Sequence, residues 1–175
     1  MVTATPSRRA VFATATPRQT SVLLALAWAV PFVVHLIPWS GERPLGAHLL
    51  PAFWTVFAAA YLFGPRIAAV TALVLPVVNL VLTGLPAAAQ VGWFAAELVL
   101  FAVLAAAGVR RWSRLPLVAP LAYLAARLVV VEIQALVRGQ ANYAAIGASL
   151  AAAFAGLVVL ALLNLALVRF RPKSA

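Results

Sequence analysis

Glu97 and Arg127 are ionisable residues in the middle of two long apolar stretches of the sequence. A charged side chain at the centre of a bilayer costs about 2.5 to 3.5 kcal/mol on insertion scales unless it is paired or faces water. If both stretches are membrane helices, each residue lies about 15 Å from the same face of the bilayer, at 1.5 Å per residue. The two side chains are therefore predicted to meet, either as a buried salt bridge that fixes helix register or as the floor of a ligand pocket open to the outside.

Other polar and aromatic residues share the helix faces of this pair. Helical spacing places Gln90 and Trp93 on the face of Glu97, and Gln134, seven residues after Arg127, on the face of Arg127. These three side chains are predicted to form walls of the pocket. Both faces are polar toward one membrane surface and apolar toward the other, so we expect the pocket to open on the polar side.

The sequence contains no recognisable catalytic or metal-binding motif. The chain has no cysteine, which excludes disulfides, thiolate catalysis and cysteine-based metal sites. His35 and His48 flank the segment 38–44, but they lack the i, i+4 spacing of a preformed metal site, and anchoring at the membrane interface is the commoner role. No nucleophile with a base, phosphate loop or carboxylate dyad is present. We therefore predict a protein without catalytic residues, metal or cofactor.

The segments that must position these residues are strongly apolar. Apolar residues make up 66% of the chain and charged residues 9%, and the mean hydropathy is +1.07, which lies outside the range of ordinary soluble domains. Gly64-Pro65 is predicted as a tight turn, because one helix over 47–82 would be about 54 Å long in a ~30 Å hydrocarbon core. The sequence thus predicts an all-α membrane protein with six transmembrane helices, at 21–37, 47–63, 66–82, 87–109, 115–137 and 143–168.

Lysine and arginine residues are concentrated in every second connection of this arrangement. The intervening connections hold only Arg43 and Arg138. Because basic residues collect on the cytoplasmic side, both termini are predicted to be cytoplasmic, with residues 1–20 as a disordered tail, 21–170 as the six-helix domain and 171–175 as a second tail. The net charge of +10 is explained by topology and not by nucleic-acid binding. The basic residues on the predicted cytoplasmic side are Arg8, Arg9, Arg18, Arg66, Arg110, Arg111, Arg114, Arg169, Arg171 and Lys173.

Small and amide residues within the spans have separate predicted roles. Ser21, Ala25 and Ala29 recur every four residues in the first helix and form a narrow face on which another helix can pack closely. That helix can belong to this chain or to a partner. Asn79 and Asn164 lie inside apolar stretches, where asparagine side chains usually form hydrogen bonds between helices.

Several short motifs follow one another between residues 21 and 111. They are Ala25-x-x-x-Ala29, Leu62-Phe63-Gly64-Pro65-Arg66, Leu75-Pro76, Leu82-Thr83-Gly84-Leu85-Pro86 and then Glu97. In this order and spacing, and in the number of predicted helices, the chain resembles the substrate-binding (S) components of energy-coupling factor (ECF) transporters.

This resemblance implies a function and partners. Such a subunit captures a vitamin-like or other small polar solute outside the cell for an ATP-driven importer, and has no enzymatic activity of its own. The face of Ser21, Ala25 and Ala29 would dock on a transmembrane coupling subunit that recruits two ATPase subunits. The solute would lie beneath the loop between the first two helices. Glu97 and Arg127 would then provide polarity, and Trp93 and Trp39 would stack on the solute or close the site.

Two other functional classes remain open at this stage. A structural or assembly protein of the membrane would use the buried charges for packing alone and bind no ligand. An intramembrane enzyme would require Glu97 or a histidine for turnover. A helical channel is disfavoured because one buried pair makes no continuous polar path. All of these functional classes place the chain in a membrane as a multi-pass protein. The importer hypothesis places it in the plasma membrane.

Overall fold

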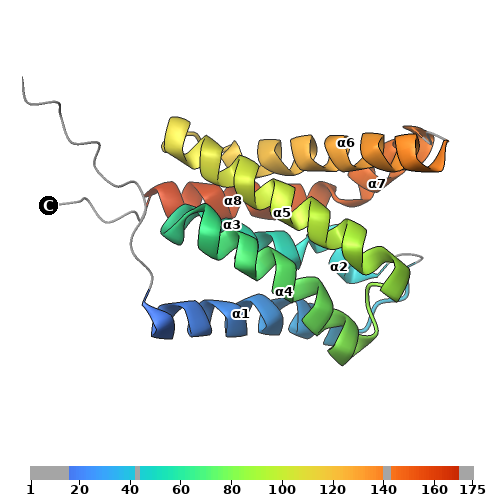
Figure 1. The fold of residues 1–175 in the computed structure, drawn as a ribbon, viewed down its shortest axis with the longest axis horizontal. Helices are drawn as coiled ribbons and strands as arrows, with labels where there is room; N and C mark the ends of the chain where they lie inside the picture. The colour runs from blue at the N-terminus through green and yellow to red at the C-terminus, as the bar shows by residue number, and fades with distance from the viewer. Residues whose placement is uncertain (1–15, 42–43, 140–142, 170–175) are drawn as a thin grey trace, which may run out of the picture.

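The computed structural model of the 175-residue chain describes residues 16–41, 44–139 and 143–169. These residues form helices and connecting turns, with no strand among them, so the prediction of an all-α chain is confirmed. Residues 1–15 of the predicted tail at 1–20, the predicted tail at 171–175, and Arg43 lie outside the described residues. The helices are α1 (Pro17–Leu36), α2 (Leu45–Leu49), α3 (Pro51–Phe63), α4 (Pro65–Thr83), α5 (Ala88–Arg111), α6 (Val118–Arg138), α7 (Tyr143–Ala152) and α8 (Phe154–Arg169) (Figure 1).

Five segments are long and apolar enough to cross a membrane. They are α1, α2 together with α3, α4, α5 and α6. A sixth crossing is obtained only if α7 and α8, which are bent by 55° at their junction, count as one span. The six predicted helices therefore correspond to six segments of the structure, but the second and the sixth are each broken into two helices. The structure thus supports five or six spans in a multi-pass arrangement.

The first helix begins earlier than predicted. It starts at Pro17, and Thr16 caps it, because the Thr16 side chain accepts a hydrogen bond from the Gln19 backbone while the Gln19 side chain accepts one from Thr16. This reciprocal cap satisfies amide groups that have no partner within the helix. Residues 17–20, which the sequence analysis placed in the disordered tail, are thus the first turn of α1.

The turn between α3 and α4 occurs where it was predicted. Gly64 has φ 84° and ψ −172°, a conformation that favours glycine, and Pro65 begins α4 with its fixed φ. The chain therefore reverses direction within one residue, and α3 packs against α4. Two separate helices result instead of one helix too long for a bilayer.

The two broken spans meet each other at their breaks. α2 ends at Leu49, the cap residue Leu50 that follows has φ 57°, and Pro51 begins α3. Gly156 of α8 lies against this break, since a Cβ atom at Gly156 would lie 2.6 Å from Leu50 Cγ and 2.8 Å from the His48 carbonyl oxygen. His48 in turn donates from Nδ1 to the carbonyl oxygen of Ala152 at 2.9 Å, at the end of α7. Each break is thus held by contacts with the other.

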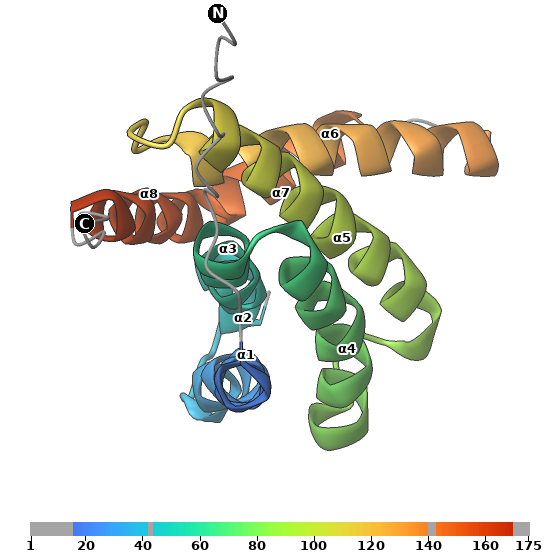
Figure 2. The same ribbon diagram turned by 60° about the vertical axis from the view of Figure 1, so that its left-hand side comes forward.

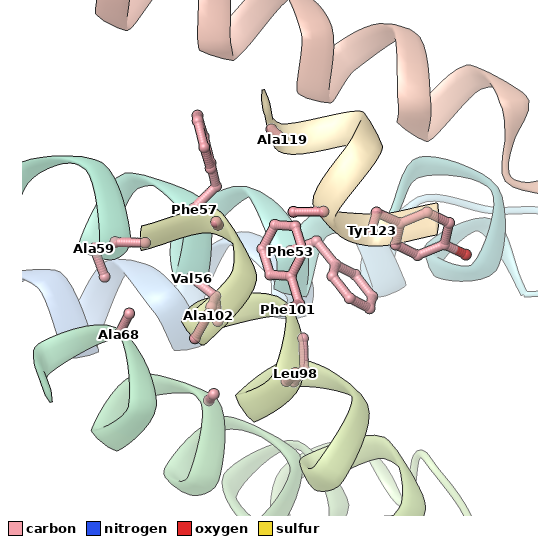
Figure 3. Packing of buried hydrophobic residues seen from close by; sticks show 14 of the residues in the cluster. Phe53, Val56, Phe57, Ala59, Ala68, Leu98, Phe101, Ala102, Ala119 and Tyr123 are labelled. Atoms are coloured by element: carbon pink, nitrogen blue, oxygen red, sulfur yellow. The ribbon is translucent and has the colours of Figure 1, made fainter. Parts of the chain in front are cut away.

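An aromatic cluster joins α3, α5 and α6 in the core. The ring of Phe53 lies 4.9 Å from Tyr123 and 5.1 Å from Phe101, centroid to centroid, both edge to face (Figure 3). Around it, alanines such as Ala59, Ala68 and Ala102 are fully buried and let the helices approach closely. This packing fixes the relative positions of α5 and α6, which carry Glu97 and Arg127.

Asn164 ties α8 to the start of α6. Its Oδ1 atom accepts a hydrogen bond from the Ala119 backbone at 2.9 Å, and its Nδ2 atom donates to the Leu115 carbonyl oxygen at 3.2 Å. The side chain therefore caps the first turn of α6 from another helix. The prediction that Asn164 bonds across helices is confirmed.

The two ends of the bundle differ in charge. α1 and α4 begin, and α5 and α8 end, at the left of Figure 1, and Figure 2 brings this end forward. We call it the basic end, because the described arginines of the connections predicted to be cytoplasmic lie here: Arg18, Arg66, Arg110, Arg111, Arg114 and Arg169. The opposite end is formed by the end of α1, α2, the 84–87 turn, the start of α5 and the end of α6. Arginines that are far apart in the sequence are thus gathered at one end, as the loop charges predicted.

Candidate functional site

Glu97 and Arg127 form an ion pair between α5 and α6. The Nη1 atom of Arg127 lies 2.9 Å from Oε2 of Glu97, a distance that corresponds to a charge-assisted hydrogen bond. Glu97 is only 6% exposed, and the Arg127 side chain is 26% exposed. The predicted contact at equal depth is therefore confirmed, and the carboxylate is the more deeply buried partner.

A third helix joins this pair through a residue that the sequence analysis missed. Nη2 of Arg127 donates a hydrogen bond to Oγ of Ser149, in α7, at 3.0 Å. The third nitrogen of the guanidinium, Nε, carries an N–H that is buried and has no hydrogen-bond partner among the described residues. Ser149 gave only a weak signal, because a single serine in an alanine-rich helix has several ordinary uses.

A cavity of about 580 Å³ lies above this pair, at the end of the bundle opposite the basic end. Its size is within the range of small-molecule sites. Every helix from α1 to α7 contributes to it, together with the 84–87 turn. The polar residues that line it are His35, Asn79, Gln90, Glu97, Arg127, Gln134, Arg138 and Ser149, and its aromatic residues are Phe53, Trp93, Phe94 and Tyr123.

Five of the six residues predicted for the pocket line this cavity: Gln90, Trp93, Glu97, Arg127 and Gln134. Helical spacing was sufficient for them, because α5 and α6 are regular over these positions. The cavity therefore has polar side chains on two neighbouring helices, α5 and α6.

Trp39 is the predicted pocket residue that lies elsewhere. It is not among the lining residues, and its side chain is 51% exposed. Its ring lies 5.5 Å from that of His48, and its indole packs directly on Gly41. These local contacts hold the indole beside the loop and outside the cavity. Trp39 thus does not line the cavity, and its assignment to stacking on the solute or closing the site stays a prediction.

Asn79, near the end of α4, is a lining residue that was expected to have a different role. It is 4% exposed, and its Oδ1 atom has no hydrogen-bond partner among the described residues. Within residues 16–41, 44–139 and 143–169, this oxygen bonds to no other helix, in contrast to Oδ1 of Asn164. A buried acceptor without a partner costs about 1 to 3 kcal/mol, and this oxygen is enclosed by the protein rather than open to the cavity.

The charges on the cavity wall do not cancel. Among the described lining residues, Glu97 is the one carboxylate, and Arg127 and Arg138 are the two guanidinium groups. One minus and two plus charges leave the wall with a net charge of +1 when His35 is neutral. Arg138 was counted in the sequence only as a loop charge, although it lies eleven residues after Arg127 and so returns to the same face of α6.

The small-residue face of α1 points away from the rest of the described protein. Ser21 and Ala25 are exposed and Ala29 is partly exposed, whereas Ala27, Pro31 and Val34 are buried against the bundle. Internal packing therefore uses a different side of α1 than the repeat Ser21, Ala25 and Ala29. This leaves the repeat accessible to lipid or to a partner helix.

The arrangement is suited to binding. The carboxylate of Glu97 already accepts a hydrogen bond from Arg127, and the cavity offers donors, acceptors and aromatic rings around an open volume.

No match was found when the chain was compared with known protein families, with curated proteins and with solved structures.

Proposed function

We propose that the protein is the solute-binding membrane subunit of an ECF-type, ATP-driven importer in the plasma membrane. In this proposal α7 and α8 are one broken span, so the chain crosses the bilayer six times and both termini are cytoplasmic. The solute is small and polar, as vitamins and their precursors are. The protein hydrolyses nothing itself and needs no cofactor.

The cavity lined by helices α1 to α7 is the observation that carries this proposal. It lies opposite the basic end, and basic residues favour the cytoplasmic side of a membrane. A cavity at that position opens toward the outside, where an importer must capture its solute. Ionisable residues at membrane depth are in general retained for a purpose that offsets their cost, and Glu97 and Arg127 form the floor of this cavity.

The exposed face of α1 supports the second part of the proposal. Ser21, Ala25 and Ala29 form a strip of small residues that internal packing leaves uncovered. Close approach of helix backbones at small residues is a common mode of association in membranes. We assign this strip to contact with the transmembrane coupling subunit, which joins the protein to two ATPase subunits.

Enlarging Ala25 tests that assignment. The variant Ala25→Phe is expected to fold normally, because Ala25 is exposed, but to lose at least tenfold in recovery of the coupling and ATPase subunits when the complex is purified from native membranes. Retention of copurified solute, measured by mass spectrometry, checks that the binding site is intact. Val81→Phe, at a 76% exposed position on α4, is the matched control and should retain the subunits. Equal recovery with both variants would remove α1 from the interface.

A structural protein of the membrane is the competing candidate, and one observation favours it. Arg127 links three helices, through Glu97 in α5 and Ser149 in α7, as a purely structural ion pair would. The two functions differ in one outcome. Purification of the wild-type protein yields a bound small molecule and ATPase subunits if the importer proposal is correct, and neither if the cavity only reflects packing.

A further inference from the structure

A second groove lies at the basic end, between the start of α1 and the end of α3. Both helix ends lie at this end of the bundle (Figures 1 and 2). The groove shares no lining residue with the cavity above Glu97 and Arg127. Its volume is about 510 Å³, and it is lined by Thr16, Arg18, Gln19, Val22, Leu26 and Phe63.

The polar and apolar residues of this groove are ordered along α1. Thr16, Arg18 and Gln19 lie at the start of the helix, and Val22 and Leu26 lie one and two turns further along it. At 1.5 Å per residue, Leu26 is about 12 Å from Arg18, which is close to the ~15 Å hydrocarbon thickness of one leaflet. The groove thus changes from polar to apolar over the depth at which a phospholipid changes from headgroup to acyl chain.

The polar side chains of the groove have unused donors. Arg18 forms no ion pair or side-chain hydrogen bond with another described residue. Gln19 uses its side-chain oxygen to accept from Thr16, which leaves its amide nitrogen to donate, and its backbone N–H is already capped by Thr16. A ligand here would therefore be held by side chains and not by the helix terminus. A guanidinium group beside an amide is suited to a phosphate oxygen.

The chain supplies no acidic side chain to neutralise this end. The connections that meet at the basic end contain no aspartate or glutamate. Arg66, an exposed residue three positions after Phe63, adds a second cation to the turn that follows the groove wall. Basic segments at the cytoplasmic surface attract anionic lipids. The charge at this end therefore favours an anionic lipid over a zwitterionic one.

From these observations we propose that the groove binds one anionic phospholipid, with its phosphate at Arg18 and an acyl chain along Val22 and Leu26. The lipid lies beside the small-residue strip of α1, because Val22 and Leu26 each follow a residue of that strip and so lie about 100° further around the helix. This inference goes beyond the proposed function, since it requires only that the basic end lies in a bilayer.

Two lipids with identical acyl chains test the charge of the ligand. The full chain in detergent is titrated with dioleoyl phosphatidylglycerol or dioleoyl phosphatidylcholine, and native mass spectrometry gives the affinity for the first bound lipid. Phosphatidylglycerol is expected to bind roughly fivefold more tightly, the effect of one net lipid charge beside one cation. Equal affinities would overturn the proposal.

A pair of charge variants tests whether Arg18 is the residue that binds the headgroup. Arg18→Gln should remove the preference for phosphatidylglycerol. Arg114→Gln removes the same charge at an exposed position of the basic end outside the groove, and should keep the preference. If both variants lose it equally, the lipid is attracted by the whole basic end, and the assignment to this groove is wrong.

A pair of size variants tests the path of the acyl chain. Val22→Trp places an indole in the groove and should weaken binding of both lipids roughly tenfold, the effect of losing about two buried methylene groups. Val33→Trp is the matched control, because Val33 lies on α1 outside the groove and its exposure of 57% is close to the 53% of Val22. Equal binding by the two variants would contradict the proposed path.

Two further outcomes would assign the groove to another occupant. Glycerol 3-phosphate carries the phosphate without acyl chains and should displace no lipid; displacement would indicate a site for a soluble anion and overturn the proposal. Loss of the coupling subunit from native membranes with Val22→Trp, without a change in lipid binding, would indicate a partner helix and also overturn it. The lipid titrations require no solute, so their failure would leave the importer proposal standing.

Discussion

Replacing Arg127 with glutamine lowers the free energy of unfolding by about 3 kcal/mol, because it leaves the carboxylate of Glu97 buried without its partner. Glu97 is 6% exposed and accepts its side-chain hydrogen bond from Arg127. Ser149 also loses the hydrogen bond that joins it to α6. The expected loss lies at the low end for a buried pair, since the Arg127 side chain is 26% exposed and borders the cavity.

The opposite replacement has a smaller effect. Glu97→Gln removes the negative charge but keeps an oxygen that accepts from Arg127, so about 1 kcal/mol is expected. The double variant Glu97→Gln with Arg127→Gln should be more stable than Arg127→Gln alone, because it contains no unpaired carboxylate. Reversible unfolding of the four proteins in mixed micelles gives the coupling energy as a double-mutant cycle. Additive losses would show that the two charges are not coupled.

Adding one methyl group at Gly156 is expected to cost about 2 kcal/mol, the middle of the range for overpacking. A Cβ atom there would lie 2.6 Å from Leu50 Cγ and 2.8 Å from two backbone atoms, the His48 carbonyl oxygen and the Leu49 carbonyl carbon. Backbone atoms of a broken helix cannot move aside as a flexible side chain can. Gly156→Ala should therefore force α8 away from the α2–α3 break.

The control for this prediction is Gly147, in α7. A Cβ atom at Gly147 meets nothing within 4 Å, so Gly147→Ala removes backbone freedom without a clash and should not lower stability. Unfolding midpoints of Gly156→Ala, Gly147→Ala and the wild-type protein, measured under the same conditions, provide the comparison. The proposed contact between the two breaks is contradicted if Gly156→Ala unfolds at the same midpoint as Gly147→Ala.

Regular helix geometry explains why the floor of the cavity was predictable. The rise per residue is constant along α5 and α6, so counting from the helix ends was enough to place Glu97 and Arg127 at one depth. The same regularity placed Gln90, Trp93 and Gln134 on the cavity wall. The distribution of lysine and arginine identified the connections that meet at the basic end. Successive helices run in opposite directions, so every second connection lies at the same end.

The broken spans could not be predicted because tertiary contacts determine them. Leucine rarely adopts a positive φ, and nothing near Leu50 in the sequence indicates that it does so here. The break is held by Gly156, more than one hundred residues later, and the bend between α7 and α8 lies beside it. Periodicity within one segment contains no information about such a pair of contacts.

The positions of three further residues could not be predicted from the sequence for a related reason. Ser149 is reached only through the long side chain of Arg127, and Asn79 is recognisable as a lining residue only once the packing of α4 beside the cavity is known. Trp39 was assigned to stacking or closure through the resemblance, and its side chain packs locally against His48 and Gly41. Helix faces are predictable from spacing, and loop side chains are not.

The direction in which the cavity opens is the claim on which the importer proposal depends. Because the chain has no cysteine, single cysteines can be introduced without a background signal. Gln90→Cys places a thiol at the exposed rim of the cavity, and Trp112→Cys places one at the basic end, at a position that is 58% exposed. In intact cells a membrane-impermeant maleimide should label Gln90→Cys and spare Trp112→Cys until the cells are permeabilised. Labelling of Trp112→Cys alone would place the cavity in the cytosol and contradict capture of a solute from outside.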